Sequence, residues 1–334
     1  LLTVIVPVYN MEHLLRQCAD SFLIDGPGRK KLEILLIDDG SSDGSPEIAK
    51  EYESAYPGMF RLIRKENGGH GSAVNRGIRE ASGKYTKVVD SDDWLDGKGL
   101  CRLLECLETV RSDIVYSNYY WYEDGSGKCT LEFPEPFPGV VYGREYSLDE
   151  LVKPYFLKMH GYTVRTSILK QIPPLDEHCF YVDMEYVLFP VPLTETVTFL
   201  EDCVYYYRIG RSGQSMSREK LARNAENYDR VLKRLLKFYT AQKREGLSSA
   251  KSLYMERVLA RMYVSRMKIF LCFPRDREIR EKMRRFAALF RKRYPEIYRE
   301  VRNRPVLLLH RTGFRAYPLV KGVFDIKERV DKIR

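Results

Sequence analysis

The sequence predicts an α/β protein with an open, mostly parallel β-sheet, followed by a basic helical region. Through the first hundred residues, short runs of β-branched residues alternate with segments of helical periodicity. After about residue 217, apolar residues recur at three- and four-residue intervals among many Lys and Arg residues. The 334 residues, of which 44% are hydrophobic, suffice for two domains or for one domain with a large appendage.

Strands and helices are expected to alternate along this first part. The predicted strands span residues 2–9, 33–38, 60–66 and 84–90. The predicted helices between them span residues 11–24, 45–56 and 70–81. The first helix would bury one apolar face, which carries Leu14, Leu15, Cys18 and Phe22. Because a helix connects each strand to the next, the strands should run parallel.

Composition argues against several other classes of protein. Charged residues make up 31% of the chain, and no apolar run approaches the roughly 20 residues that a membrane-spanning helix requires. The first ten residues lack the basic leader of a signal peptide. The seven cysteines form no C-x-x-C pair, which argues against a disulfide framework and a structural zinc site. We therefore expect a protein of the reducing cytoplasm.

Charge is distributed unevenly along the chain. Residues 1–210 contain 22 Lys and Arg against 33 Asp and Glu, a net charge of −11, whereas residues 211–334 contain 34 against 13, a net charge of +21. An imbalance of this size suggests an anionic partner for the second part. The basic residues are dispersed along helices without a recognised nucleic-acid-binding module, so we do not expect that partner to be nucleic acid.

Carboxylates and glycines gather where the predicted strands end. Ligands of open parallel sheets bind beyond the carboxyl ends of the strands. In chain order, these ends read Pro7-Val8-Tyr9-Asn10, Asp38-Asp39-Gly40-Ser41, Asn67-Gly68-Gly69-His70-Gly71 and Asp90-Ser91-Asp92-Asp93. The four segments should therefore meet at one edge of the sheet.

The last of these segments predicts a metal site. Asp90, Asp92 and Asp93 lie within four residues of one another and would repel one another strongly without a neutralising cation. Oxygen ligands favour Mg²⁺ or Mn²⁺, and Mg²⁺ often joins one or two carboxylates to a substrate diphosphate. The alternative interpretation is a solvated, Asp-rich turn with an aspartate capping the next helix.

The glycine-rich segment has two interpretations. Residues 67–72 precede a predicted helix and present backbone amides that suit an anion. The alternative is a tight turn that needs glycine for its positive φ angles. No G-K-S/T follows, which argues against a Walker loop, and the turn after the first strand has no glycine, which argues against a dinucleotide-binding fingerprint.

Residues 2–100 resemble the nucleotide-binding half of family 2 glycosyltransferases of the GT-A fold. The resemblance rests on the order and spacing of P-V-Y-N, D-D-G-S-S-D-G-S, E-N-G-G-H-G-S-A-V-N-R-G and D-S-D-D. It implies a GT-A type, Rossmann-like sheet flanked by helices and an inverting transfer of a sugar from a UDP-sugar. The domains would be a nucleotide-sugar-binding half over residues 1–110, an acceptor-binding half over residues 111–216 and a basic helical region over residues 217–334.

The resemblance assigns nucleotide-binding roles to the strand ends. Tyr9 would stack on the base, and Asp39 would accept a hydrogen bond from the uracil imide, with Asp38 as the alternative. The residues expected around the nucleotide are Pro7, Tyr9, Asn10, Asp38, Asp39, Asn67, Gly68, Gly69 and Asp90. Where the family often has an arginine this chain has Val74, which puts a diphosphate contact from that position in doubt.

Diphosphate and metal ligands follow from the same resemblance. Asp92 would hold the metal against the diphosphate, with Asp90 and Asp93 as further metal ligands. A later Y-R-I-G-R-S-G-Q-S-M-S segment resembles one in soluble bacterial members, and three of its residues would close over the diphosphate: Arg208, Arg211 and Gln214. The alternative for this segment is a loop before a Ser-capped helix.

The catalytic base of the family belongs to an E-D pair about ninety residues after the metal motif. Here the first acid is replaced by Val182, so Asp183 is the expected base and Glu185 the second candidate. The alternative is that Asp183 only caps a helix over residues 184–189. His160 is interpreted as structural rather than catalytic.

These residues together predict a metal-assisted hexosyltransferase of cell-surface polysaccharide synthesis. The expected partners are a UDP-sugar donor and a glycan or lipid-linked acceptor. The basic helices would pack on the catalytic domain, dock on the anionic inner face of the plasma membrane, or do both. The alternative functions are a nucleotide-sugar-binding pseudoenzyme, which the missing first acid permits, and a sugar nucleotidyltransferase.

Overall fold

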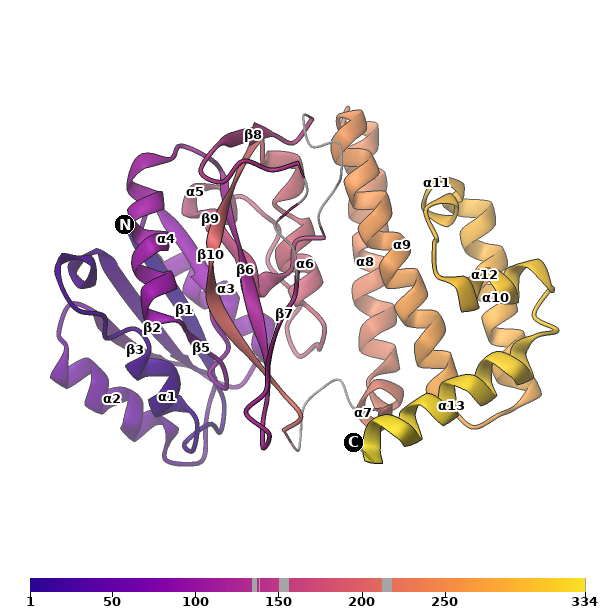
Figure 1. Ribbon diagram of the computed structural model, residues 1–334, viewed down its shortest axis with the longest axis horizontal. Coiled ribbons are helices and arrows are strands. Elements are labelled where there is room, and N and C mark those ends of the chain that lie inside the picture. Colours follow the sequence, from indigo (N-terminus) through magenta and orange to yellow (C-terminus); the bar gives the residue numbers. More distant parts are fainter. Residues whose placement is uncertain (134–136, 138, 150–155, 212–217, 334) are drawn as a thin grey trace. The chain divides into compact units, whose positions relative to one another are not determined.

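The computed structural model describes residues 1–133, 137, 139–149, 156–211 and 218–333, and the last seven of these as backbone only (Figure 1). The chain divides into two compact units, residues 1–212 and 213–334. This division falls close to the predicted start of the basic region at residue 217. The separation of the first unit into donor and acceptor halves stays a prediction.

The first four strands form the parallel sheet that the sequence predicts. They lie in the order β3-β2-β1-β4, and all three pairings are parallel. Their bounds are β1 (Leu2–Val8), β2 (Leu32–Asp38), β3 (Phe60–Arg64) and β4 (Tyr85–Val88). Every residue of β1 is buried, as expected of a central strand covered on both faces.

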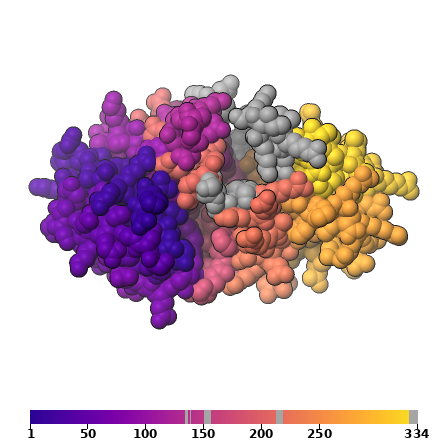
Figure 2. Space-filling view, turned by 90° about the horizontal axis from the view of Figure 1, so that it is seen from below, coloured from indigo at the N-terminus to yellow at the C-terminus, as the bar shows by residue number. Residues whose placement is uncertain are grey.

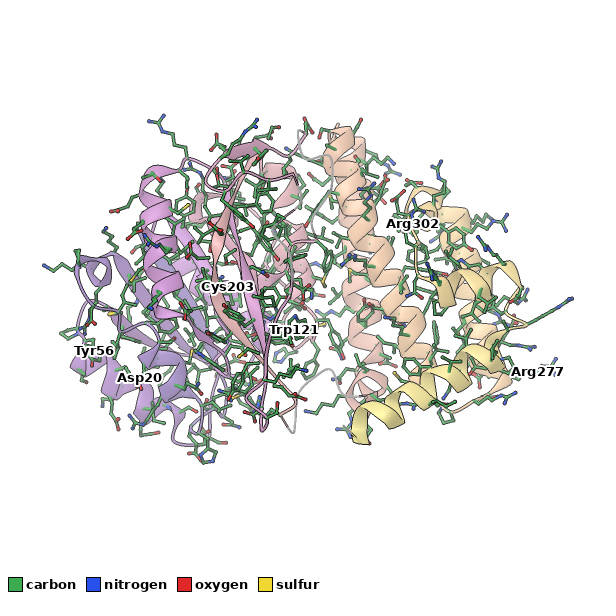
Figure 3. All side chains as sticks on the ribbon, in the orientation of Figure 1. Asp20, Tyr56, Trp121, Cys203, Arg277 and Arg302 are labelled. Atoms are coloured by element: carbon green, nitrogen blue, oxygen red, sulfur yellow. The ribbon has the colours of Figure 1, made fainter. Side chains whose placement is uncertain are left out.

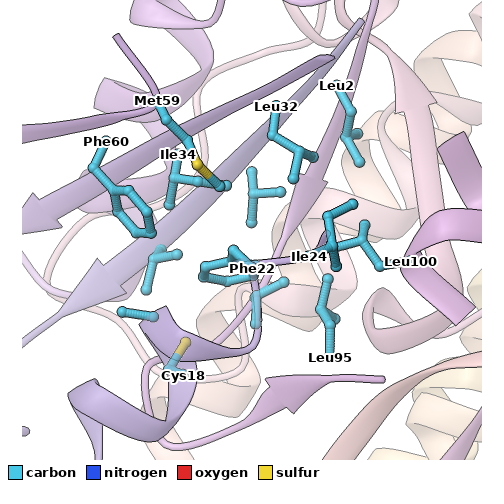
Figure 4. Close-up of a cluster of buried hydrophobic side chains, with 14 of the residues drawn as sticks. Leu2, Cys18, Phe22, Ile24, Leu32, Ile34, Met59, Phe60, Leu95 and Leu100 are labelled. Atoms are coloured by element: carbon cyan, nitrogen blue, oxygen red, sulfur yellow. The ribbon is translucent and has the colours of Figure 1, made fainter. Parts of the chain in front are cut away.

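Helices cover both faces of this sheet. Side chains of α1, α2 and α4 join alternate residues of β1 in one hydrophobic cluster, part of which Figure 4 shows. On the other face α3 approaches β1 closely, because Gly77 lies against Ile5. The bounds are α1 (Leu15–Asp20), α2 (Ser45–Ala55), α3 (His70–Glu80) and α4 (Gly97–Thr109).

The first helix is shorter than its periodicity predicts. The expectation was residues 11–24, whereas α1 spans Leu15–Asp20. The chain turns after Asp20, where the Ser21 hydroxyl donates to the Cys18 carbonyl oxygen, and Phe22 packs beside Phe60 with ring centroids 6.4 Å apart. Burial of Phe22 in the core thus overrides the local helical pattern.

Beyond β4 the sheet becomes mixed, and its order continues as β4-β9-β6-β10-β5. Strand β9 is antiparallel to both neighbours, whereas β10 is parallel to β6 and antiparallel to β5. The added strands are β5 (Trp94–Leu95), β6 (Ile114–Glu123), β7 (Cys129–Leu131), β8 (Glu145–Ser147), β9 (Tyr162–Arg165) and β10 (Thr196–Ile209). Two short helices, α5 (Thr166–Leu169) and α6 (Asp183–Leu188), connect this part.

The second unit is helical, as the basic, periodic sequence predicts. Its helices are α7 (Arg218–Arg223), α8 (Ala225–Arg244), α9 (Ser249–Cys272), α10 (Arg277–Arg293), α11 (Pro295–Arg299), α12 (Arg304–Arg311) and α13 (Tyr317–Ile333). Side chains of Ser248, Asp276 and Asn303 cap the amino ends of three of them. Among the described residues, we find no helix with the length and apolar content needed to cross a bilayer.

Candidate active site

Three aspartates follow β4 and occupy different environments. Asp93 is buried; Tyr205 Oη donates to its Oδ2 over 2.5 Å, and the Arg208 amide donates to its Oδ1 over 2.8 Å. Burial raises the pKa of Asp93 well above its usual range, and the charges of Asp92 and Asp90 raise it further. A neighbouring cation would therefore favour its charged form.

Asp90 and Asp92 face partly outward and meet cationic side chains. His70 Nε2 lies 2.9 Å from Asp90 Oδ1, and Arg211 Nη2 lies 2.7 Å from Asp92 Oδ2. Burial raises the pKa of Asp90, but the charge and hydrogen bond of His70, together with the charge of His160, outweigh burial and lower it. The pKa of Asp92 is raised by burial and by Asp90, and Arg211 only partly opposes the shift.

A histidine from a distant segment joins these carboxylates. One ligand atom each of Asp90, Asp93 and His160 lies within 4.8 Å of the other two. Nδ1 of His160 is buried and has no hydrogen-bond partner among the described residues. Burial lowers the pKa of His160 to about 3, so its imidazole is neutral and able to ligate a cation. The donor set thus fits a divalent metal held by Asp90, Asp93 and His160, with Asp92 beside them.

A buried lysine supports this histidine from below. Lys87, on β4, is fully buried, and its Nζ donates to the His160 carbonyl oxygen over 2.6 Å. Burial lowers the pKa of Lys87 to about 7. The contact fixes the turn at residues 159–161 against the central sheet, and so fixes the place of His160.

The glycine amides that suit an anion are occupied by a carboxylate of the chain itself. Oδ1 of Asp39 accepts from the Gly68 amide over 3.0 Å and from Lys65 Nζ over 2.6 Å, and Oδ2 accepts from the Gly69 amide over 2.7 Å. Gly69 has a φ of 82°, so the tight-turn interpretation is confirmed there. Asp39 therefore organises the loop of residues 67–69.

Asp38, the alternative base-reading residue, has structural partners. It is fully buried, and its carboxylate accepts from the Ser41 amide over 2.9 Å and from Arg64 Nε over 3.1 Å. Its role toward a base stays a prediction. Tyr9, by contrast, is exposed directly after β1, where a ring could stack on a base. Pro7 is buried within β1, and exposed Asn10 accepts from the Ser42 amide over 2.8 Å.

Arg208 has structural partners in this structure. Its side chain donates through Nε to the Asp92 carbonyl oxygen over 2.8 Å, through Nη1 to Asp124 over 2.6 Å and through Nη2 to Gln17 over 2.5 Å. Arg208 is only 5% exposed, so its guanidinium would have to leave these partners to reach a diphosphate, and that role stays a prediction. Arg211 stays at the rim on Asp92. Gln214 lies outside the described residues.

The expected base opens helix α6. Desolvation of the Asp183 carboxylate raises its pKa above the usual value; the charge of His70 opposes this shift and that of Asp90 reinforces it. Glu185, the second candidate, is fully buried and accepts from the Asp176 amide over 2.7 Å. Glu185 therefore has a structural partner, and its catalytic role stays a prediction.

The segment before α6 is docked on the glycine-rich start of α3. The His178 amide donates to the Gly68 carbonyl oxygen over 2.5 Å, and a Cβ at Gly71 would collide with the Asp176 carbonyl oxygen. Asn75 and Leu175 exchange two hydrogen bonds at the same surface. The glycines of this motif therefore permit the approach of the segment that carries Asp183.

One tyrosine packs against the candidate metal-site histidine. The Tyr207 ring on β10 lies 4.1 Å from the His160 ring and 4.9 Å from that of Trp121, which Figure 3 labels. Burial raises the pKa of Tyr207, and the charges of nearby carboxylates add to this shift. Tyr207 therefore lines the candidate site beside His160.

Comparison with known proteins identifies the family. The sequence profile described as "Glycosyl transferase family 2" matches residues 3–180, more than half of the chain. The chain belongs to glycosyl transferase family 2. This glycosyltransferase is 30% identical over 225 residues to Glycosyltransferase GlyA of Streptococcus pneumoniae serotype 4, covering 64% of this chain and 31% of GlyA. It is 30% identical over 214 residues to the uncharacterized glycosyltransferase EpsJ of Bacillus subtilis, covering 62% of this chain and 61% of EpsJ.

A solved structure shows the same fold. S. aureus TarS 1–349, crystallised with UDP-GlcNAc, superposes with a TM-score of 0.68 and 20% sequence identity, covering 98% of the glycosyltransferase and 92% of that chain. At this identity the likeness concerns the fold alone. It confirms the GT-A type arrangement of a central sheet flanked by helices, and the family confirms a transferase.

Within this glycosyltransferase, sequence reasoning missed four residues of the site. His160, Tyr207, Lys87 and His70 line or support the carboxylate cluster. His70 stands inside a motif that was recognised, and its position directly after two glycines was the available signal. His160 lies outside all the recognised motifs, so long-range packing alone brings it to Asp90.

Proposed function

We propose that this glycosyltransferase moves a hexose from a UDP-sugar to a hydroxyl of a glycan or lipid-linked acceptor, with inversion at the anomeric carbon. The observation that carries the proposal is that the segment leading to Asp183 is docked on α3 through Asn75 and Gly71, while His70 at the start of α3 lies 2.9 Å from Asp90. An inverting transfer needs a base on one side of the anomeric carbon and charge neutralisation for the departing diphosphate on the other. The proximity of Asp183 to a carboxylate-rich cation site meets both needs.

The donor would enter at the ends of β1 to β4. Tyr9 offers an exposed ring to the base, and the Asp39-bound loop of residues 67–69 forms the neighbouring wall. Binding of UDP-GlcNAc by TarS, which shares the fold, supports a uridine nucleotide here. Asp39 accepts at both oxygens already, so base recognition through Asp39 would use a remaining lone pair.

The cation would be held by Asp90, Asp93 and His160, with Asp92 adjacent. A bound Mg²⁺ or Mn²⁺ supplies charge neutralisation for the diphosphate leaving group. The guanidinium of Arg211 pairs with Asp92. There it can add a second positive charge, besides that of the cation, to neutralise the diphosphate. The raised pKa values of Asp92 and Asp93 are the electrostatic sign that these carboxylates need such a partner.

Asp183 would take the proton of the attacking acceptor hydroxyl. The acceptor oxygen forms the new bond to the anomeric carbon, the bond from that carbon to the diphosphate oxygen breaks, and UDP leaves with the bonding electrons. Asp183 is exposed at the start of α6, so an acceptor hydroxyl can reach its carboxylate. The rings of Tyr207 and Trp121 contact each other. We expect the acceptor sugar to pack against these two rings.

The proposal is tested by UDP release from a panel of UDP-sugars with Mn²⁺ or Mg²⁺. Asp183→Asn should lower turnover by about 10² to 10⁴-fold while UDP binding persists, and Asp92→Ala should weaken both. Asp25→Asn, at an exposed aspartate outside the site, is the matched control. Undiminished turnover in Asp183→Asn would refute the assignment of the base.

Two alternatives give different results in the same assay. Val182 replaces the first acid of the family's pair, which favours a nucleotide-sugar-binding pseudoenzyme; such a protein would bind UDP-sugars without any turnover. A sugar nucleotidyltransferase would release pyrophosphate from UTP and a sugar 1-phosphate, and not UDP.

We propose that the enzyme works in the cytoplasm on polysaccharides destined for the cell surface. Its basic second unit would lie at the anionic inner face of the plasma membrane.

A further inference from the structure

Helix α13 exposes a row of large apolar side chains. Leu319, Val323 and Ile326 are 63%, 59% and 63% exposed. Because they are separated by four and then three residues, they lie on one side of the helix. Single exposed apolar residues are common on protein surfaces, whereas a contiguous row marks an interaction surface. We call Leu319, Val323 and Ile326 the apolar row.

The other side of α13 anchors it in the second unit. Tyr317, Val320 and Lys321 are buried there. Lys321 Nζ lies 2.6 Å from Asp325 Oδ1, and Asp325 also pairs with Arg218 of α7 over 2.9 Å. Arg218 in turn donates to the carbonyl oxygen of Cys272 at the end of α9 over 3.1 Å. The helix is therefore held by several contacts and presents the apolar row outward.

Basic side chains outnumber acidic ones on the surface of the same unit. Figure 2 shows one face of this unit, coloured orange to yellow by residue number. Helix α10 carries eight exposed basic residues against the two acids Glu278 and Glu281. The basic residues are Arg277, Arg280, Lys282, Arg284, Arg285, Arg291, Lys292 and Arg293. Arg311 and Arg315 are exposed shortly before α13. The partner of the apolar row must therefore tolerate a strongly positive neighbourhood.

Charge decides between the possible occupants. Residues 211–334 carry a net charge of +21, so two copies meeting through this unit would repel each other. An anionic bilayer attracts the cations and accepts apolar side chains at its interface. A soluble polyanion would satisfy the cations but offers nothing to the apolar row. Of these three occupants, the lipid surface matches both features.

We infer that α13 is a membrane-docking helix, which buries the apolar row in the interface of an anionic phospholipid bilayer while exposed Lys and Arg residues of the same unit face lipid phosphates. This inference names the residues that would make the membrane contact proposed above. It rests on the proposed function for the location of the enzyme at the membrane. It requires no step of sugar transfer, so vesicle binding and turnover can fail independently.

The test is co-sedimentation of the full chain with two kinds of vesicle: phosphatidylcholine alone, and phosphatidylcholine mixed with phosphatidylglycerol. The parent should bind only the anionic vesicles. The triple variant Leu319→Ser, Val323→Ser and Ile326→Ser should bind them with an affinity at least about tenfold lower. Val141→Ser is the matched control, because Val141 is 62% exposed but belongs to the first unit. Thermal melting confirms that the variants fold, and UDP release without vesicles should be unchanged in the triple variant.

Three results would overturn the inference. The triple variant would bind anionic vesicles as tightly as the parent if the contact were purely electrostatic. Sedimentation equilibrium would show a parent dimer that the triple variant loses, without vesicle binding, if a second copy covered the row. Binding of the parent to soluble polyphosphate but to neither kind of vesicle would assign the basic surface to a polyanion.

Discussion

Asn75 and Leu175 exchange two hydrogen bonds across one hundred residues of sequence. Asn75 Nδ2 donates to the Leu175 carbonyl oxygen over 2.9 Å, and the Leu175 amide donates to Asn75 Oδ1 over 2.8 Å. Both residues are buried. The pair fixes the segment that leads to Asp183 on helix α3, which begins at the loop organised by Asp39. The donor side and the base side of the site therefore share one support.

Asn75→Ala should lower turnover more than it lowers donor affinity. Loss of the amide leaves two buried backbone groups of Leu175 unpaired, which costs about 2–4 kcal/mol of unfolding free energy. A displaced base segment should reduce kcat by about 100-fold, whereas UDP binding, measured by calorimetry, changes little. Arg79→Ala on the exposed side of α3 is the control. Equal losses of kcat and UDP affinity would contradict a specific role in positioning the base.

Gly71→Ala should have a similar effect through steric exclusion. A Cβ at residue 71 would overlap the Asp176 carbonyl oxygen, which is backbone and cannot rotate away. We expect a loss of about 1–3 kcal/mol in unfolding free energy, together with reduced turnover. Gly97→Ala at the start of α4 is the matched control, because its nearest atom would be 3.9 Å away on Ile24. Denaturant unfolding and UDP release measure the two effects, and a fully active Gly71→Ala enzyme would disprove the close approach.

Substitution of Arg208 should lower the stability of the protein, whereas substitution of Arg211 should weaken UDP binding. Arg208 joins the Asp92 carbonyl oxygen to the side chains of Asp124 and Gln17, so Arg208→Ala should destabilise the first unit by about 3 kcal/mol. Arg211→Ala removes only a rim contact to Asp92 and should leave the melting temperature nearly unchanged while weakening UDP binding. Melting curves and UDP titrations of both variants check this. The reverse pattern would support the role that the sequence predicts for Arg208.

The parts of the site that could be predicted from sequence are those encoded by local pattern. The four parallel strands follow from short β-branched runs, and the aspartates after β4 follow from their spacing within one turn. The family's E-D pair, about ninety residues after the metal motif, then indicates Asp183, whose role as the base stays a prediction. Each of these inferences needs only neighbouring residues or a motif of fixed spacing.

The remaining features depend on contacts that no local pattern encodes. Arg208 follows a tyrosine run that resembles a diphosphate-binding segment, but pairing of β10 beside Asp93, 115 residues away, turns its guanidinium inward. Glu185 lies two residues after Asp183, and a helical turn therefore points it into the core toward the Asp176 amide. His160 reaches Asp90 only because β9 inserts antiparallel between β4 and β6.

A histidine in the second unit should make its stability depend on pH. His310 Nε2 lies 2.8 Å from Tyr263 Oη, and its ring stacks on Tyr298 at 4.7 Å. Burial lowers the pKa of His310 to about 4, below the usual value of about 6.5 for an unfolded chain. The unfolded state therefore binds a proton that the folded state does not, and stability is lost as the pH falls from about 6.5 toward 4. His310→Gln, which keeps a hydrogen-bonding group without titrating there, should melt with a smaller difference between neutral and mildly acidic buffer than the parent. An identical difference in parent and variant would show that His310 does not cause the acid sensitivity.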